Sequence, residues 1–554
     1  MHQLKTLTLN CTVLAMASVA GAALAQTPPD AGQTLQQLKQ QPPAPPTESR
    51  ALTIPSQPTS ESTLPGGAQV NVSSIEVKGN TALSQDKLAP VLADAIGKSY
   101  DLAGLRALTD RLTTFYRQAG YPFARAYLPP QNLQDGVLRI KLIEGRYGAV
   151  KAQSPDPRLA EQAQKFLQAL RPGDVIQDKP LERTTLLLDD LPGIQTTPII
   201  RPGQQTGTGD LDIGVALKQG FTGDVGLDNH GNRYSGYNRV RANVNWNTPF
   251  RLGDQISLRS VVSDHSLWLA ALSYSAPIGF AGLRGNVGYA LTSYELGREF
   301  TSLQANGTAE VTSIGVTYPL IRSQASNAIV SLTYQHKVLK DNKDSTHTRE
   351  SKFSNSLPLA LQFDHRDSLG GGGITYGVLS WTNGGLKLDD NLSAADLQNT
   401  RGEFNRINLE LARLQTLPQG LTLSTRWSQQ MATKNLDSSE KFSLGGASGV
   451  RAYPTGEGTG DEGWLTQIEL RYSMGSTIPY AFYDHGAIRT STFAPTNSTT
   501  NRRDLSGAGM GIRYQREQWS LDATVAWRAR GGKAQSDPSR DASPTAWVSL
   551  GYRF

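Results

Sequence analysis

The sequence predicts an α+β amino-terminal part, built of two tandem domains, followed by an all-β transmembrane barrel of sixteen strands. Three observations predict this fold. Residues 71–218 carry a strand–helix–helix–strand–strand pattern twice, and residues 219–554 change to short segments in which apolar and polar residues alternate. The links between those segments are alternately compact and long. Short turns at one end and long loops at the other are typical of bacterial outer-membrane barrels.

The first 25 residues have the layout of a secretory signal peptide. Lys5 precedes an apolar stretch from about Leu7 to Ala23, and 23-ALA-25 supplies the small residues of a cleavage site before Gln26. We therefore expect residues 1–25 to be removed on export. The single cysteine, Cys11, lies within this segment, so the mature chain is expected to form no disulfide and no thiolate metal site.

Residues 26–70 are of low complexity. The stretch 31-AGQTLQQLKQQ-41 can form a short polar helix, and residues 42–67 are rich in proline, serine and threonine, which is typical of an extended linker. The alternative is a plain disordered tail.

The first copy of the duplicated pattern covers residues 71–145. Ser84 can cap a helix that runs through about Ala95, and Asp101 can cap a second helix in which leucines recur at helical spacing. The three strands of this copy are expected at residues 73–79, 122–128 and 136–145. A three-stranded sheet with two helices on one face is the economical fold for such a unit.

The second copy covers residues 146–218 and repeats the order of the first. Its strands are expected at residues 148–153, 194–200 and 210–217, and its helices at residues 158–170 and 180–191. Each copy has about 70 residues, which is near the lower limit for an independent hydrophobic core.

The remaining residues, 219–554, alternate as strands do. Val240, Ala242, Val244 and Trp246 alternate with polar residues, and the last segment ends at Phe554. The count of such segments is even, as bacterial outer-membrane barrels require. The sixteen segments begin near residues 221, 238, 255, 267, 283, 308, 328, 357, 374, 402, 420, 464, 479, 505, 518 and 545.

The links between these segments differ in length in a regular way. Links after segments 2, 4, 6 and 10 are compact, as at 248–254 and 417–420. Links after segments 7, 9, 11, 13 and 15 are long and polar, including 340–356 and 531–544. A soluble β-sandwich or propeller has no reason to alternate its connections in this way, so the pattern favours a barrel in the membrane.

Composition and motifs exclude several classes of function. A net charge of +6 over 554 residues, without a basic run, does not favour nucleic-acid binding. The seven histidines are scattered without an H-E-x-x-H motif, and 97-GKS-99 lacks the first glycine of a phosphate loop. No nucleophile elbow is found. We therefore expect no catalytic residue, no cofactor and no metal site, and the chain is not predicted to be an enzyme.

Three short motifs lie at informative places in the barrel region. One lies in the loop between segments 11 and 12, one has period two on segment 13, and one ends segment 1. The residues are Val450, Arg451, Ala452 and Tyr453 in the first motif, Phe482, Asp484 and Gly486 in the second, and Asp228, Asn229 and Gly231 in the third.

In this order, the motifs resemble the VRGY, F-x-D-x-G and D-N-x-G segments of the outer-membrane transporters of two-partner secretion (TpsB type). These transporters are relatives of the BamA insertases. The two small domains resemble POTRA domains, and the resemblance covers nearly the whole mature chain. Ala452 stands where the family has glycine, which is expected to restrict the backbone beside Arg451.

The resemblance implies where the motif residues meet. The sixth loop is expected to fold back into the barrel, where the Arg451 guanidinium would form a forked pair with the Asp484 carboxylate. The alternative is that Arg451 is an exposed loop charge worth well under about 1 kcal/mol. The helix at 31–41 resembles the family's plug helix in the pore. A terminal aromatic residue such as Phe554 resembles the signal read by the barrel assembly machinery.

The resemblance also implies a function and a location. The expected function is a monomeric pore in the outer-membrane lipid that secretes one large exoprotein, an adhesin, haemolysin or contact-dependent toxin, without nucleotide hydrolysis. Its POTRA domains would bind the unfolded exoprotein in the periplasm, unless they are only spacers. Two alternatives remain open, an insertase of the BamA or TamA type and a passive porin or ligand receptor. Two rather than several POTRA-like domains disfavour the first, and the presence of such domains disfavours the second.

Overall fold

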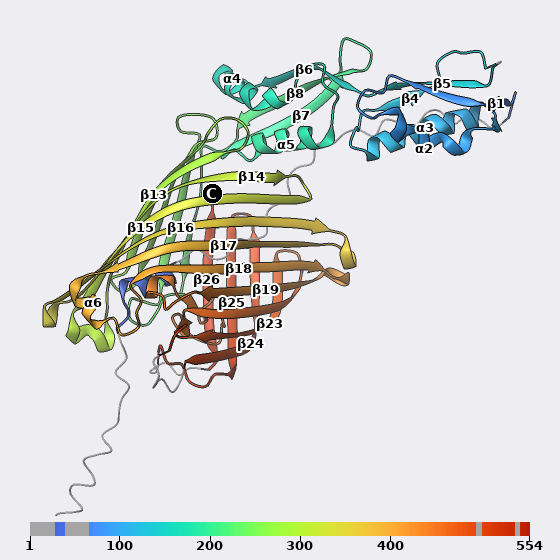
Figure 1. The fold of residues 1–554 in the computed structure, drawn as a ribbon. Helices are drawn as coiled ribbons and strands as arrows, with labels where there is room; N and C mark the ends of the chain where they lie inside the picture. The colour runs from blue at the N-terminus through green and yellow to red at the C-terminus, as the bar shows by residue number, and fades with distance from the viewer. Residues whose placement is uncertain (1–27, 39–65, 134, 495–500, 538–542) are drawn as a thin grey trace, which may run out of the picture.

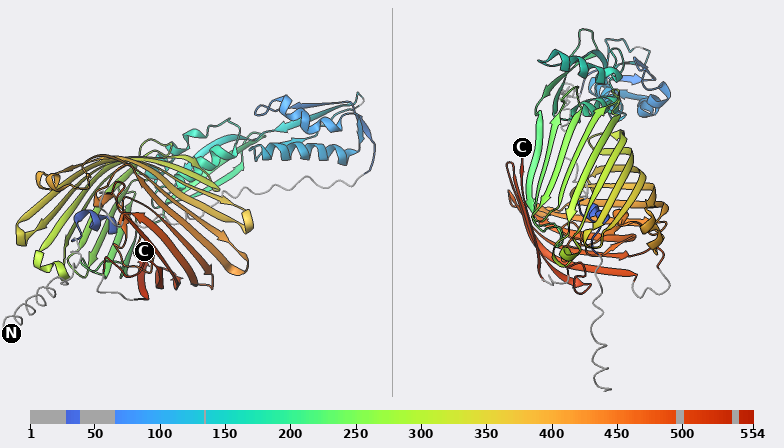
Figure 2. Two further views of the ribbon diagram at one scale, coloured as in Figure 1. Left: turned by 60° about the horizontal axis from the view of Figure 1, so that its bottom comes forward. Right: turned by 90° about the vertical axis from the view of Figure 1, so that its left-hand side faces the viewer.

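The computed structural model describes residues 28–38, 66–133, 135–494, 501–537 and 543–554. The predicted signal peptide, residues 1–25, and most of the proline-rich segment lie outside the described residues. Two small α+β domains follow one another beside one end of a large β-barrel, and a short helix lies inside the barrel (Figures 1 and 2).

The first domain contains a three-stranded sheet with strand order β2-β5-β4, in which β2 is parallel to β5 and β4 is antiparallel to it. Leu112 and Tyr116 from α3 are buried against Leu138 and Ile140 of the sheet. The elements are β1 Val70–Val72, β2 Ser74–Lys78, α2 Gln85–Leu92, η1 Ala93–Ala95, β3 Lys98–Tyr100, α3 Leu102–Gln118, β4 Arg125–Tyr127 and β5 Val137–Ile143.

The two predicted helix caps of this domain have different outcomes. Asp101 caps α3 by accepting a 2.8 Å hydrogen bond from the Gly104 amide, so this prediction is confirmed. Ser84 occupies the N-cap position of α2, but its side chain makes no capping hydrogen bond. Between the two helices, Lys98–Tyr100 forms β3, which pairs with β1 as a two-stranded ribbon.

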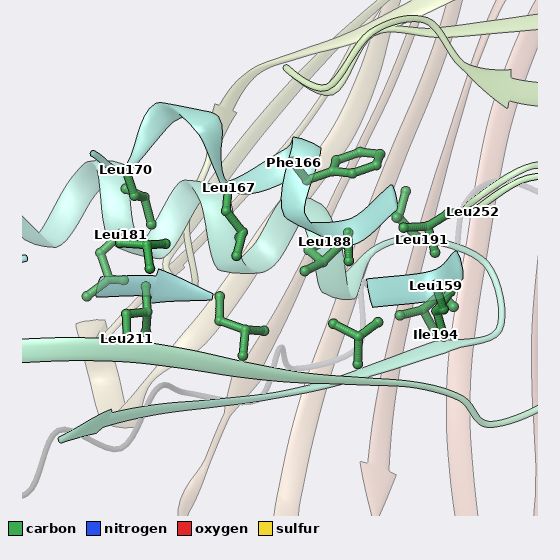
Figure 3. Close-up of a cluster of buried hydrophobic side chains, with 14 of the residues drawn as sticks. Leu159, Phe166, Leu167, Leu170, Leu181, Leu188, Leu191, Ile194, Leu211 and Leu252 are labelled. Atoms are coloured by element: carbon green, nitrogen blue, oxygen red, sulfur yellow. The ribbon is translucent and has the colours of Figure 1, made fainter. Parts of the chain in front are cut away.

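The second domain repeats this topology, with strand order β6-β8-β7 and its two α-helices packed on the sheet. Phe166, Leu181, Leu188 and Leu211 lie at the centre of its buried core (Figure 3). The elements are β6 Arg146–Gln153, α4 Pro157–Phe166, η2 Leu167–Ala169, α5 Asp178–Asp189, β7 Ile194–Pro202 and β8 Thr208–Leu217.

Sixteen strands of the described chain form a closed antiparallel barrel, as predicted. They pair in chain order, and β26 closes the ring by pairing with β9. The strands are β9 Phe221–Asp228, β10 Arg239–Asn247, β11 Gln255–Ser263, β12 Trp268–Pro277, β13 Arg284–Glu295, β14 Ala305–Arg322, β15 Ser326–Lys343, β16 Thr348–Asp367, β17 Gly373–Leu388, β18 Gly402–Thr416, β19 Leu421–Ala432, β22 Glu462–Tyr472, β23 Thr477–Arg489, β24 Arg502–Arg516, β25 Trp519–Arg530 and β26 Thr545–Arg553.

In the described parts of the links between these strands, the elements are short. They are η3 Arg298–Leu303, η4 Asp344–Thr346, η5 Leu369–Gly371, α6 Asp390–Ala395, η6 Pro418–Gly420, η7 Ser438–Glu440, β20 Phe442–Ser443 and β21 Thr459–Gly460. Within the described residues, no helix is long and apolar enough to cross a membrane.

One predicted link is wrong. Residues 340–356 were expected to form a long polar loop, but β15 and β16 stay paired through Lys343 and Thr348, with only η4 between them. Both faces of this hairpin are polar near its tip, so the apolar–polar alternation disappears while the backbone pairing continues. Strands that extend past the apolar band of a barrel lose the pattern by which they are recognised.

Large apolar side chains cover the outer face of the barrel. Their exposure to the surroundings, on a wall whose inner face carries many charged groups, is the arrangement expected of strands in contact with lipid. Examples are Leu272, Tyr289, Ile314, Trp381, Ile407 and Met510.

The second domain is joined to the barrel through the short turns at the near end of the barrel. Leu252, from the turn between β10 and β11, is buried within the core of the domain (Figure 3), and its amide donates a 2.7 Å hydrogen bond to Gln162. Arg322, at the end of β14, forms a two-pronged pair with Asp190, with both distances 2.6 Å. The turns of the barrel are therefore part of this domain's packing.

We predict that Leu252→Ala loosens the joint between the second domain and the barrel. Loss of a buried leucine side chain costs about 2–5 kcal/mol, and here the cost falls on the contact between domain and turn. Spin labels in α5 and β14 should give a broadened distance distribution, whereas the heat-modifiable migration of the barrel stays unchanged. Leu320→Ala, which removes an exposed leucine of β14, is the matched control. An unchanged distribution for Leu252→Ala would contradict the prediction.

Candidate functional site

The link between β19 and β22 folds back into the barrel rather than projecting from it. Within this sixth loop, Leu444 donates a 2.9 Å hydrogen bond to Gly458, and Gly446 donates one of 3.0 Å to Tyr453. Val450 and Tyr453 are fully buried. The glycine-rich sequence therefore has a compact internal structure, in which β20 and β21 pair.

Arg451 lies within this loop, and its guanidinium contacts Asp484 on the inner face of β23. Nε donates a 2.8 Å hydrogen bond to Oδ2, and Nη2 donates one of 2.7 Å to Oδ1. The main-chain amide of Arg451 donates a third, of 3.1 Å, to Oδ2. Asp484 has no exposed surface and Arg451 is 4% exposed. The structure thus brings together the two residues that the sequence predicted to pair.

Phe482 and Glu469 complete the surroundings of the guanidinium. The Phe482 ring lies beneath it, with 3.5 Å between Cζ and the ring centroid, which is a cation–π contact. Nη1 donates a 2.6 Å hydrogen bond to Glu469 of β22. Sequence reasoning missed Glu469. Its signal was an acid at an inward position of β22, directly paired with Phe482 of the motif.

Glu469 extends the ion pair into a network across the inner wall. Its carboxylate also pairs with Arg471 at 2.7 Å and with Arg513 at 3.1 Å. Arg513 continues to Asp522 at 2.8 Å. Buried charges are tolerated only when they are paired and hydrogen-bonded, and removing one partner of a buried pair costs about 3–5 kcal/mol. The network therefore fixes the Arg451 end of the motif to β22 and β23.

Ala452 fits its position without strain. It is not among the residues with positive φ, so its methyl group meets no backbone penalty. The facing residue on β24 is Gly507, and a Cβ added there would lie 2.4 Å from the Ala452 Cβ. The expected restriction at Ala452 is thus accommodated by a glycine on the neighbouring wall.

The carbonyls and the tyrosine of the loop motif are held by the last strands. Trp547 Nε1 donates a 2.7 Å hydrogen bond to the Arg451 carbonyl, and Thr545 donates one of 3.0 Å to the Ala452 carbonyl. The Tyr453 hydroxyl donates to the Arg530 carbonyl at 2.8 Å. The motif therefore contacts β25 and β26 as well as β23.

Gly486 of the second motif allows the loop to approach closely. A Cβ added at Gly486 would lie 2.6 Å from Leu444 Cδ2 and 2.6 Å from the Trp464 carbonyl. Phe482, Asp484 and Gly486 thus all face the loop. Phe482 lies beneath the guanidinium, Asp484 pairs with it, and Gly486 leaves room for the Leu444 side chain.

The third motif lies apart from the Arg451 pair, near the seam of the barrel. The buried Asp228 carboxylate pairs with Arg239 at 2.8 Å and with Arg241 at 2.7 Å. Asn229 donates a 3.0 Å hydrogen bond to the Ala546 carbonyl and accepts one of 2.9 Å from the Val548 amide. A Cβ added at Gly231 would lie only 1.9 Å from the Gly236 carbonyl. This motif fastens the first strand to the last.

A helix occupies the interior of the barrel (Figure 2). It is α1 Ala31–Gln37, within the range 31–41 in which a polar helix was expected. Asp30 caps it through the Gln33 amide at 2.8 Å and also pairs with Lys352 at 2.8 Å. The Ala31 amide donates a 2.8 Å hydrogen bond to Asp341.

The helix is held by both the wall and the sixth loop. Lys352 bridges Asp30 to Asp437 of the loop, which also lies 2.8 Å away. Ser438 donates a 2.7 Å hydrogen bond to Asp30, and a Cβ added at Gly32 would lie 2.2 Å from Ser438 Oγ. These contacts were not foreseen from the sequence, because each partner is an isolated polar residue without a local pattern.

The chemistry of the site is that of positioning. The described residues contain no group of three or more His, Cys, Asp or Glu side chains that could hold a metal ion. What the arrangement does is fasten a loop and a helix inside the barrel by a few ion pairs.

Two family models match the chain. One, described as haemolysin secretion/activation protein ShlB/FhaC/HecB, matches residues 207–514, and the other, described as POTRA domain of the ShlB type, matches residues 70–145. The heme/hemopexin transporter protein HuxB of Haemophilus influenzae (strain 86-028NP) is 28% identical over 453 residues, which is 79% of each chain. The outer membrane transporter CdiB of Escherichia coli is 26% identical over 489 residues, 84% of this chain and 79% of that relative.

The solved structures agree in fold. CdiB from Escherichia coli superposes with a TM-score of 0.73 at 21% identity, covering 91% of this chain and 94% of that one. Since the first family model spans more than half of the sequence, the chain belongs to the haemolysin secretion/activation proteins of the ShlB/FhaC/HecB family, the outer-membrane transporters of two-partner secretion.

Proposed function

We propose that this transporter exports one large, unfolded exoprotein from the periplasm, and that α1 and the sixth loop together keep the pore shut until that exoprotein arrives. The single observation that carries the proposal is a polar helix held by an ion pair inside a closed barrel. An insertase has no need of a plug, and a passive porin has no need of tandem POTRA domains. The exoprotein would belong to the adhesin, haemolysin or contact-dependent toxin class.

The POTRA domains would bind the exoprotein through their free sheet edges. The strand orders leave β2 and β4 at the edges of the first sheet, and β6 and β7 at the edges of the second. An extended peptide can add to such an edge through main-chain hydrogen bonds, which tolerate many sequences. In the second sheet, Pro198 and Pro202 remove two amide donors from β7, and Gln164 already bonds to the Val150 carbonyl and the Ala152 amide of β6. The first sheet is therefore the better candidate for strand addition.

Transport would draw its energy from folding of the exoprotein outside the cell. The chain has no phosphate-loop motif, and nothing in the proposed cycle requires a catalytic residue or a cofactor. Each molecule would act as a monomer, since one barrel encloses its own plug and its own loop.

The role proposed for the Arg451 pair is to hold the loop against β23 in the shut pore. Arg451 donates three hydrogen bonds to the Asp484 carboxylate and one to that of Glu469. The contact therefore requires a defined orientation of the guanidinium as well as opposite charges. When the pair is intact, the loop also presents Asp437 to Lys352 and so to the plug.

We predict that Arg451→Ala and Asp484→Ala each reduce export of the exoprotein while the barrel still assembles. Arg451→Ala leaves Asp484 buried without its base, which costs about 3–5 kcal/mol, whereas Asp484→Ala leaves Arg451 its contact with Glu469. The Arg451 variant should therefore lose more. The double variant should be no worse than Arg451→Ala, because the two residues act as a unit.

The measurement is the amount of a coexpressed exoprotein that is exported per assembled transporter. Arg489→Ala is the control, because Arg489 lies on the same strand but is exposed. Full export by Arg451→Ala, or strictly additive losses in the double variant, would show that the pair does not act in transport.

We predict that Asp30→Ala opens the pore more often without preventing assembly. The change removes the helix cap and the pair with Lys352 at once, and loss of a cap alone costs about 1 kcal/mol. Planar bilayers should show a raised open probability. Asp390→Ala, which removes an exposed acid in α6, should leave conductance as it was. An open probability of Asp30→Ala equal to that of the parent would contradict the plug assignment.

Phe554 is proposed to act in assembly by the barrel assembly machinery. Its amide and carbonyl pair with Gly223 of β9, both at 3.0 Å, and its side chain is 42% exposed. We predict that Phe554→Ala lowers the amount of heat-modifiable barrel in cells, whereas refolding into detergent proceeds as in the parent because the main-chain pairing survives. Equal amounts in cells would count against a role for the aromatic ring.

A further inference from the structure

The wall that faces the plug on β10 and β11 carries three arginines. Arg239 and Arg241 share one carboxylate, that of Asp228. Arg259, on the next strand, pairs with no carboxylate in the described part of the chain. Its Nη2 donates a 2.7 Å hydrogen bond to the Leu38 carbonyl at the end of α1. We call Arg239, Arg241 and Arg259 the arginine wall.

A cavity of about 530 Å³ lies between the arginine wall, the plug helix and the sixth loop. Gln33, Gln36 and Gln37 of α1 line one side of it, and the arginine wall lines the other. Lys441 also lines it, but this lysine is paired with Asp461 at 3.1 Å. The side of the plug that faces the arginines is therefore neutral, and the space between them is polar.

Withdrawal of the plug makes this lining more positive. Residues 28–38 contain one acid, Asp30, and no base. Their departure removes the Asp30 carboxylate from Lys352, which keeps Asp437, and removes the Leu38 carbonyl that accepts the hydrogen bond of Arg259. Asp341 is uncovered at the same time, but it keeps the Tyr294 hydroxyl as a donor.

Several other acids of the interior are paired with bases that remain in place. Glu410 and Asp364, which accept hydrogen bonds from Ser428 and Asn327 instead, lie on β18 and β16, away from the arginine wall. Glu440 pairs with Lys337 and Arg406, and Glu457 with Arg503. The carboxylates of β22 and β23 belong to the Arg451 network. The excess of positive charge on the arginine wall is thus not offset by these groups.

We propose that the open pore prefers anions to cations, and that the arginine wall sets this preference along the path of the exoprotein. The proposal rests on the plug leaving the pore. Charges that line a narrow passage with low-dielectric walls raise the local concentration of counter-ions. One unpaired charge about 7 Å from a passing ion changes its population about threefold even in water-filled surroundings. Polar stretches of the exoprotein with acidic side chains would meet the same field.

The test is the reversal potential of the full-length protein in planar bilayers under a gradient of potassium chloride. Asp30→Asn is used to raise the frequency of opening. We expect the sign of the reversal potential to show that chloride permeates more easily than potassium. Arg259→Glu should lower the ratio of chloride to potassium permeability by about threefold or more. Arg259→Gln should shift it in the same direction by less. The preference should weaken at high salt, since the Debye length falls to about 3 Å at 1 M.

Arg125→Glu is the matched control, because it makes the same change of charge on an exposed residue of the first POTRA domain. Its permeability ratio should equal that of the parent. A potassium-selective parent, or a ratio that Arg259→Glu leaves unchanged, overturns the proposal. If Asp30→Asn opens no more often than the parent, the plug assignment fails, and the selectivity is then read from the spontaneous openings of the parent.

Discussion

The buried pair of Arg451 and Asp484 is the contact on which the interior of this barrel depends. A loop rich in glycine loses much conformational entropy when it is ordered, and here a set of short, charged hydrogen bonds in a region closed to water compensates for that loss. With the pair in place, three further contacts can form. The loop backbone contacts β25 and β26, Asp437 reaches Lys352, and Lys352 reaches the plug.

In the proposed shut pore, the plug and the sixth loop are held by several contacts that follow one another from Asp484 to Asp30. The pair at Arg451 is enclosed, whereas the pair of Lys352 with Asp30 lies at the end of a short helix and retains some exposure. An arriving polypeptide would therefore displace the helix more easily than the loop. Lys352 and Ser438 both link the plug to the loop through Asp30. Movement of the plug leaves the loop its own pair of Arg451 with Asp484.

Much of the architecture could be predicted from periodicity, because a barrel strand in lipid must alternate. The predicted starts lie within three residues of the observed ones except for β16, which begins at Thr348 rather than near residue 357. There the strands are polar on both faces, so no alternation marks them. The pairing of Arg451 with Asp484 was expected only from the resemblance to a family. Glu469, Lys352 and Asp341 were missed because a single inward charge on a strand has no local signature, and its partner is fixed by how the loop and helix fold.

Leu252 has a consequence for the order in which the molecule forms. It belongs to the first short turn of the barrel, yet its side chain completes the hydrophobic core of a domain that ends before the barrel begins. The Phe280 ring of the next turn also packs edge-on against Phe166 of that domain, with ring centroids 5.3 Å apart. During synthesis the second POTRA domain therefore emerges with an unfilled hollow and an exposed apolar rim. Its core is completed only when Leu252 and Phe280 are in place, so the final packing of this domain depends on the first turns of the barrel.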